Sequence, residues 1–145
     1  SFLHRRTGWE FDWKKFAFTT RHNYISLDGY IRKGAISAQK GERVLIPLNM
    51  RDGCIIGIGK GNPDWNYSAP HGAGRIMSRS EAKKTLKLED FQKTMEGIYS
   101  TSVSAETIDE APFAYKPSEE IIELVADTVY IEQIIKPLQN YKATE

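Results

Sequence analysis

The residues with the clearest capacity for chemistry lie between Pro70 and Arg75, where the sequence reads PHGAGR. Pro70 fixes the backbone in front of His71, and the glycines behind the histidine leave main-chain amides uncovered. Such amides can bind a phosphate through their N–H groups, above all beside the positive end of a helix. An imidazole next to a phosphate acts as a general acid or base, or as a nucleophile on phosphorus. The alternative is that His71 is an ordinary loop histidine and that the glycines serve only the turn.

Two arginines and two carboxylates extend this pattern. If Arg75 and Arg79 both lie in a helix, their spacing of four places them on one face, where each can offer a forked donor to phosphate oxygens. Further along, Asp109 and Glu110 fit either acid–base chemistry or a solvated turn.

His22, in the sequence HNYI, is a second candidate. A histidine on a strand can bind a metal ion, but catalytic zinc sites use about three protein ligands, so one imidazole is not a site. On the residues alone, His22 is better explained as a histidine of the core or its rim. Cys54 is the single cysteine of the chain and cannot form an internal disulfide, which indicates a reducing compartment.

The composition is typical of one soluble domain. The chain has 145 residues, of which 40% are apolar, and this is long enough to bury a core without disulfides. No apolar run is long enough for a transmembrane helix, and the first residues lack the apolar stretch of a signal peptide. We therefore expect a single domain over residues 1–145 in the cytoplasm.

Charge is divided unevenly along the chain. Residues 1–87 carry 16 Lys and Arg against 7 Asp and Glu, whereas residues 88–145 carry 4 against 12. A basic segment of this kind can face the phosphates of a polyanion. The alternative is that the two parts pack together and neutralise one another.

The elements that must position these residues are hairpins followed by helices. Asp28-Gly29 and Asp52-Gly53 each lie between apolar-rich runs and predict two hairpins within residues 16–61. Pro47 within the second hairpin indicates either an edge strand or an interrupted ladder. Residues 62–74 are rich in turn formers and predict a long loop.

Helices are predicted from capping and periodicity in the second half of the chain. Ser78 and Glu81 match a capping box, and Gly97 is the expected stop of a second helix. The expected elements are helices over 80–87, 89–96 and 118–128, a strand over 98–103, and a last segment over 129–142 that is a strand with an irregular tail. Helix 118–128 should begin after Pro117 and carry an apolar stripe of Ile121, Ile122, Leu124 and Val125. The fold class is α+β: a mostly antiparallel sheet built from hairpins, with about three helices packed on it.

Five segments between Arg21 and Lys142, taken in order, resemble the C-terminal part of the RtcB-type RNA-splicing ligases. They include residues 33–47, 70–83 and 109–116, and the sequence NMRDG is typical of a divergent RtcB-like branch. Because the likeness is to the C-terminal part, the chain is expected to be a C-terminal fragment of a longer ligase.

The resemblance implies a manganese-dependent enzyme that joins an RNA 3'-phosphate or 2',3'-cyclic phosphate end to a 5'-hydroxyl end, using GTP. His71 is the implied nucleophile, which forms a GMP-histidine, and His22 is the implied manganese ligand. The implied partners are RNA, GTP and an archease-type activator, and the implied tasks are tRNA splicing or RNA repair. The alternative is a non-catalytic phosphate or RNA binding module, inactive alone because upstream metal-binding motifs are absent.

The resemblance also implies a set of nucleotide-binding residues, with departures at three of them. The set is Asn23, Pro47, Leu48, Asn49, Met50, Cys54, His71, Gly72, Ala73, Gly74, Tyr115 and Lys142. Leu48 and Asn49 replace a glycine and a serine of the family, and Cys54 replaces a serine with a weaker donor. The family's other manganese ligands, an Asp, a Cys and two His, have no counterpart in this sequence.

Overall fold

The computed structural model describes residues 2–27 and 29–142, with only the backbone of residues 2–4. The helices are α1 (Phe2–Thr7), α2 (Trp13–Phe16), α3 (Arg79–Thr85), α4 (Leu88–Thr94) and α5 (Ser118–Val125). The 3-10 turns are η1 (Pro63–Trp65), η2 (Ile108–Glu110) and η3 (Pro112–Ala114). The strands are β1 (His22–Ile25), β2 (Ile31–Ser37), β3 (Arg43–Pro47), β4 (Cys54–Gly59), β5 (Ser68–Pro70), β6 (Tyr99–Ser100), β7 (Val129–Ile135) and β8 (Gln139–Asn140). Within this part of the chain, every helix is too short or too polar to cross a bilayer.

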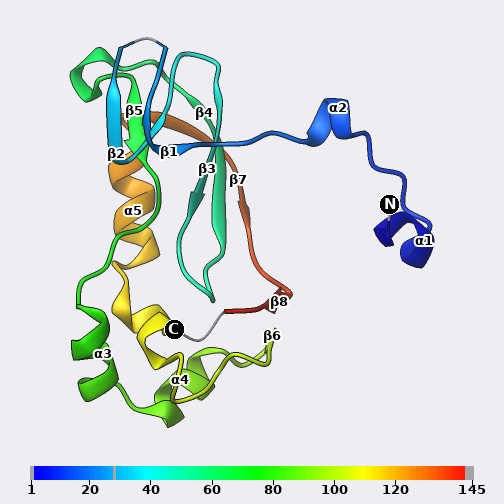
Figure 1. The fold of residues 1–145 in the computed structure, drawn as a ribbon, viewed down its shortest axis with the longest axis vertical. Helices are drawn as coiled ribbons and strands as arrows, with labels where there is room; N and C mark the ends of the chain where they lie inside the picture. The colour runs from blue at the N-terminus through cyan, green and yellow to red at the C-terminus, as the bar shows by residue number, and fades with distance from the viewer. Residues whose placement is uncertain (1, 28, 143–145) are drawn as a thin grey trace.

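Two antiparallel sheets occupy one end of the molecule and short helices the other (Figure 1). The strand orders are β1-β2-β5 and β3-β4-β7, and β6 and β8 form a short parallel pair. The α+β class and both predicted hairpins are confirmed, but the hairpins enter two sheets rather than one. β3 is an edge strand, the first of the two arrangements that Pro47 indicates, because Pro has no N–H to donate to a further strand.

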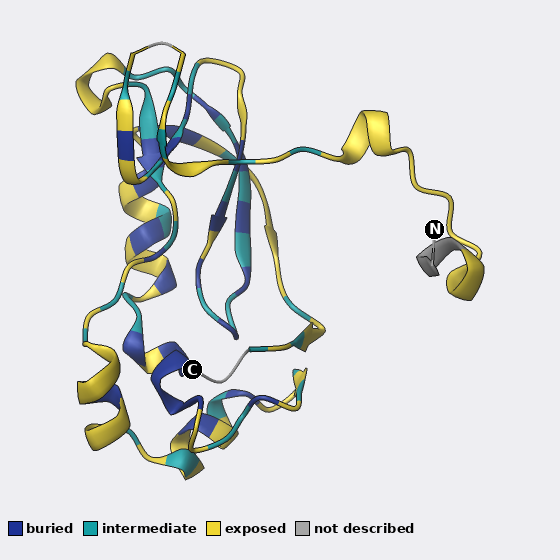
Figure 2. Ribbon diagram, in the orientation of Figure 1, coloured by how far each residue is buried: buried dark blue, intermediate teal, exposed yellow. Residues whose placement is uncertain are grey.

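The larger core lies between the sheets and α5. Ile121 and Val125 of α5 pack with Val44, Ile46 and Ile55 of the second hairpin. Figure 2 shows this burial on one side of α5 and on β3 and β4.

The apolar stripe predicted for α5 is wrong at one position. Leu124 is 59% exposed, because the inward positions of a helix recur every three or four residues and the set that faces inward here is Ile121 and Val125. Ile122 lies between them, partly buried against the core.

A second, smaller core holds the helical end together. Phe91 and Met95, at α4, pack with Ile108 of η2 and with Met50 from the turn between β3 and β4. The predicted capping box is confirmed on one side, because the Ser78 hydroxyl accepts the amide N–H of Glu81.

Two sequence predictions in the middle of the chain are wrong. Residues 62–74 are not all loop, because η1 and the three-residue strand β5 lie within them, and β5 pairs with β2. The predicted strand over 98–103 shrinks to the two residues of β6, which pair only with the chain end. Both cases are short pairings between distant segments, which leave little local periodicity to detect.

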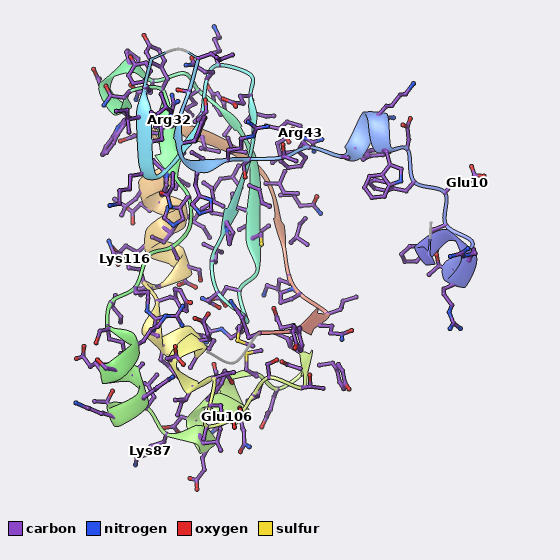
Figure 3. The ribbon with its side chains drawn as sticks, viewed as in Figure 1. Glu10, Arg32, Arg43, Lys87, Glu106 and Lys116 are labelled. Atoms are coloured by element: carbon purple, nitrogen blue, oxygen red, sulfur yellow. The ribbon has the colours of Figure 1, made fainter. Side chains whose placement is uncertain are left out.

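The N-terminal segment leaves the body as an extended arm that carries α1 and α2, and Glu10 lies along it (Figures 1 and 3). Its aromatic residues Trp9, Phe11, Trp13 and Phe16 are all exposed. The arm therefore contributes little to either core.

Gly53 is required where β4 begins beneath the end of β7. Its φ of +85° is left-handed, and an added Cβ would lie 1.9 Å from the carbonyl oxygen of Ile135. Gly53→Ala should therefore lower the free energy of unfolding by about 3 kcal/mol or more, combining backbone strain with the clash. Gly97→Ala is the matched control: Gly97 has φ +87° but nothing within 4 Å, so we expect only about 1 kcal/mol. Urea denaturation of both variants measures the difference, and equal losses would contradict the clash.

Candidate functional site

A cleft of about 630 Å³ lies between the sheets and the helical end. Most of its lining comes from four segments: the start of β1, the turn between β3 and β4 with the strand ends beside it, the loop after β5, and the chain at the end of β7 and beyond; Ile36 of β2 and Tyr115 complete it. Its volume is in the range of small-molecule and cofactor sites. Among the described residues that line it, none is Asp or Glu, whereas His22, His71, Arg75 and Lys142 all are present.

His22 and His71 lie together in this cleft. Their rings stack with centroids 5.0 Å apart and an angle of 19° between planes, and both residues are exposed. The cause is the first sheet, in which β2 pairs with β1 on one side and β5 on the other. His22 begins β1 and His71 follows β5, so the shared neighbour brings them side by side. The two histidines to which the resemblance gives roles thus face the same cleft.

Asn23 lies next to His22 but does not line the cleft. It adopts a left-handed φ of 56° at an irregularity in the β1–β2 register, and its Oδ1 accepts the amide N–H of Gly34 at 2.7 Å. Its side chain thus fastens the first hairpin. The structure does not bring Asn23 together with the other expected nucleotide contacts.

Leu48, Asn49 and Met50, in the turn between β3 and β4, line the cleft, and their side chains also have partners within the protein. The Leu48 side chain is buried in the larger core and that of Met50 in the smaller one. Asn49 is occupied within the turn: its Oδ1 accepts two backbone amides, and its Nδ2 donates to Asp52. The Arg51 guanidinium, followed by the Asn49 amide, lowers the pKa of Asp52 to about 2, so the turn keeps this carboxylate ionised.

The loop after β5 is fixed from beneath by the second hairpin. The Ala73 amide donates to the Pro47 carbonyl at 3.0 Å, and the Ala73 side chain is buried. Gly72 passes so close to Pro47 that an added Cβ would lie 3.3 Å from this same oxygen. Beside this loop in the cleft lies Cys54, and burial raises the pKa of its thiol. Cys54 therefore presents a neutral, weakly donating S–H.

The prediction for Arg75 and Arg79 is wrong. Arg75 precedes α3 instead of lying in it, so the two do not share a helical face. The Arg75 guanidinium donates to the carbonyl oxygen of Asp109 at 2.6 Å, and Arg79 donates to the carboxylates of Asp109 and Glu110 at 2.6 and 2.7 Å. The arginines bind these groups because a buried carboxylate without a cation is strongly unfavourable. At this point the basic and acidic parts of the chain do neutralise one another.

Asp109 and Glu110, here called the acid pair, are buried rather than part of a solvated turn. They are 4% and 8% exposed, and they belong to η2. Burial on its own would raise the pKa of Glu110, but hydrogen bonds from Lys142 and Tyr115 outweigh it and lower that pKa. Burial also opposes ionisation of Asp109, but hydrogen bonds from Arg79 and from the main chain, with the nearby Lys83 ammonium, together outweigh it and lower the pKa of Asp109. Carboxylates with a lowered pKa that are bound to cations are unsuited to accepting and returning a proton, so the acid–base prediction is also unsupported.

Lys142 reaches the cleft from the far end of the chain. β7 runs beside β4, and the chain then turns so that β8 pairs with β6. The Ser102 hydroxyl accepts the Lys142 N–H at 2.9 Å and donates to its carbonyl at 3.1 Å. The Lys142 ammonium lies 2.9 Å from a Glu110 carboxylate oxygen, beside Tyr115. The residues alone predict only an irregular tail here, and it is the resemblance that gives Lys142 a role.

The described residues do not fit a complete metal centre. No group of three or more His, Cys, Asp or Glu side chains within residues 2–27 and 29–142 is placed to hold a metal ion. His22 can offer one imidazole, and most of a coordination shell would have to come from elsewhere.

Comparison with known proteins decides the family. The family model described as tRNA-splicing ligase RtcB matches residues 5–143. The chain belongs to the RtcB family. An RNA-splicing ligase RtcB of Escherichia coli K12 is 36% identical over 117 residues, which cover 76% of this chain and 28% of the relative. A tRNA-splicing ligase RtcB of Aeropyrum pernix is 38% identical over 110 residues, covering 72% and 22%. The chain thus spans about a quarter of the length of these RtcB relatives.

Proposed function

We propose that this chain is the guanylate-accepting, C-terminal part of a GTP-dependent RNA ligase, with His71 as the nucleophile. In this proposal a ring nitrogen of His71 attacks the α-phosphorus of GTP, an N–P bond forms, and pyrophosphate leaves. The guanylate then passes to an RNA 3'-phosphate, and a 5'-hydroxyl end displaces GMP as the RNA ends join.

The observation that carries the proposal is the charge of the cleft. His71 is exposed at its surface, Lys142 and Arg75 supply cations, and no described lining residue is a carboxylate. Such a site attracts the triphosphate of a nucleotide and stabilises the charge that develops as the phosphorus is attacked. The names of the RtcB relatives, which describe RNA and tRNA splicing, support RNA as the substrate.

Each remaining contact has a defined role in the proposal. The stacked His22 ring limits the orientations of His71, and the backbone of residues 47–50 and 72–74 surrounds the phosphate. Tyr115 and Lys142 lie at the end of the cleft, where the guanine would lie. Manganese would take His22 as one ligand and the rest from outside the described residues, and would supply positive charge beside the phosphate.

The experiment uses a chimera in which this chain replaces its matching segment in the Escherichia coli relative. After incubation with manganese and GTP labelled at the α-phosphate, we expect protein-bound label that is stable to base and labile to acid, as a phosphoramidate is. Trypsin should release the label on peptide 61–75, whose single histidine is His71. Label on another peptide would contradict the proposal. A folded chimera that binds RNA but takes up no label would favour the non-catalytic binding module.

A further inference from the structure

We propose that Glu110 is a positioning residue, whose buried carboxylate holds the Lys142 ammonium and the Tyr115 hydroxyl in place at the end of the cleft. The inference rests on the proposed function, in which these two side chains meet the guanylate. Glu110 itself does not line the cleft, so it acts through the residues that do.

Both carboxylate oxygens of Glu110 are occupied. One accepts the Tyr115 hydroxyl at 2.8 Å and lies 2.9 Å from the Lys142 ammonium. The other accepts Arg79 at 2.7 Å. With its side chain 11% exposed, Glu110 is shielded from water, and charge-assisted hydrogen bonds are strong in such surroundings.

The Glu110 carboxylate is held by two arginines in addition to its contacts with Lys142 and Tyr115. Arg79 holds it from the first turn of α3, and the Arg75 guanidinium lies 3.6 Å away while bonded to the main chain at Asp109. The adjoining Ile108 is packed in the smaller core. A carboxylate fixed in this way is a rigid support, which is what precise positioning of a flexible partner requires.

Lys142 is the partner that needs such a support. A lysine side chain has many rotamers and loses much conformational entropy when it is ordered. Here Ser102 holds its main chain and Glu110 its ammonium before any ligand arrives. An ammonium has three N–H donors, and the described contacts occupy one, so donors remain for a nucleotide. Ordering Lys142 in advance lowers the entropic cost of binding.

Asp109 provides a matched control within the acid pair. It shares Arg79 with Glu110 and lies 3.7 Å from Lys83, but no described contact joins it to Lys142 or Tyr115. Asp109→Asn and Glu110→Gln each remove one buried negative charge from the same cluster. If the acid pair had a purely structural role, Asp109→Asn and Glu110→Gln would affect Lys142 and the GTP requirement to a similar extent.

The first readout needs no nucleotide. In the 145-residue chain, acetylation of Lys142 by an amine-reactive reagent is followed by mass spectrometry, with Lys136 of the same terminal segment as the internal standard. In Glu110→Gln the Lys142 rate should rise roughly fivefold, because the ammonium loses its ionic partner. In Asp109→Asn it should stay near the wild-type value. Equal rates in the two variants, or no rise in Glu110→Gln, would overturn the proposal; if that variant does not fold, Glu110→Asp tests the same contact with the charge kept.

The second readout separates this inference from the proposed function. In the chimera, Glu110→Gln should raise the GTP concentration for half-maximal guanylation roughly tenfold and leave the maximal extent unchanged, whereas Asp109→Asn should not raise it. If Lys142 acetylation responds but the unsubstituted chimera takes up no guanylate, the proposed function fails and the positioning contact stands. If the unsubstituted chimera is guanylated and Glu110→Gln behaves like it, the positioning role fails.

Discussion

His71→Ala should reduce guanylate uptake by the chimera at least about a thousandfold, because in the proposal His71 supplies the nitrogen that bonds to the α-phosphorus. The measurement is the labelling assay described above, run at saturating GTP. His71 is exposed, so its removal should change the free energy of unfolding by less than about 0.5 kcal/mol. Loss of label with an unchanged thermal transition therefore reports chemistry rather than folding.

His22, whose ring stacks on that of His71, supplies the control for His71→Ala. In the proposal, His22 contributes one metal ligand and His71 the nucleophile, although the rings are 5.0 Å apart and both exposed. Raising the manganese concentration should restore labelling in His22→Ala and leave His71→Ala unlabelled. Undiminished labelling in His71→Ala would remove the histidine from the reaction. If raised manganese restores labelling in both variants, both histidines affect the reaction only through metal binding, and His71 is not the nucleophile.

Local signals in the sequence predicted most of the elements that shape the cleft. The Asp-Gly pairs marked both hairpins, Ser78 marked the start of α3, and Pro117 that of α5. These features depend on residues a few positions apart, so their causes are visible in a short window. Pairings between distant segments, such as β2 with β5, leave no comparable trace.

The arginines and the acid pair show why the candidate site was harder to predict than the fold. Arg79 and Glu110 are 31 positions apart, and nothing in the sequence near either residue indicates that the two side chains are in contact. A spacing of four residues describes a helical face, but it says nothing about what lies opposite that face. The same limit applies to Leu48 and Met50: the resemblance implies that they contact a nucleotide, and only the fold shows that both line the cleft while their side chains belong to two separate cores.

Lys142→Met should raise the GTP concentration for half-maximal guanylation of the chimera at least about tenfold. The substitution keeps the length and apolar stem of the side chain and removes a cation that pairs with guanylate in a partly wet cleft. The Lys142 side chain is 38% exposed, so the free energy of unfolding should fall by no more than about 1 kcal/mol. A titration of GTP in the labelling assay measures the first effect, and thermal denaturation measures the second.

Lys136→Met is the control, because Lys136 is an exposed lysine in the same terminal segment and does not line the cleft. Lys136→Met should titrate like the unsubstituted chimera. If Lys142→Met also gives the wild-type titration, the tail has no part in nucleotide binding.

A double variant tests whether Glu110 acts on the nucleotide through Lys142. If that carboxylate acts mainly through Lys142, Glu110→Gln should add little to the GTP requirement once Lys142 is methionine, because contacting residues with one shared effect are not additive. Full additivity would mean that Glu110 reaches the nucleotide by another route, of which the Tyr115 hydroxyl at 2.8 Å is the first to examine.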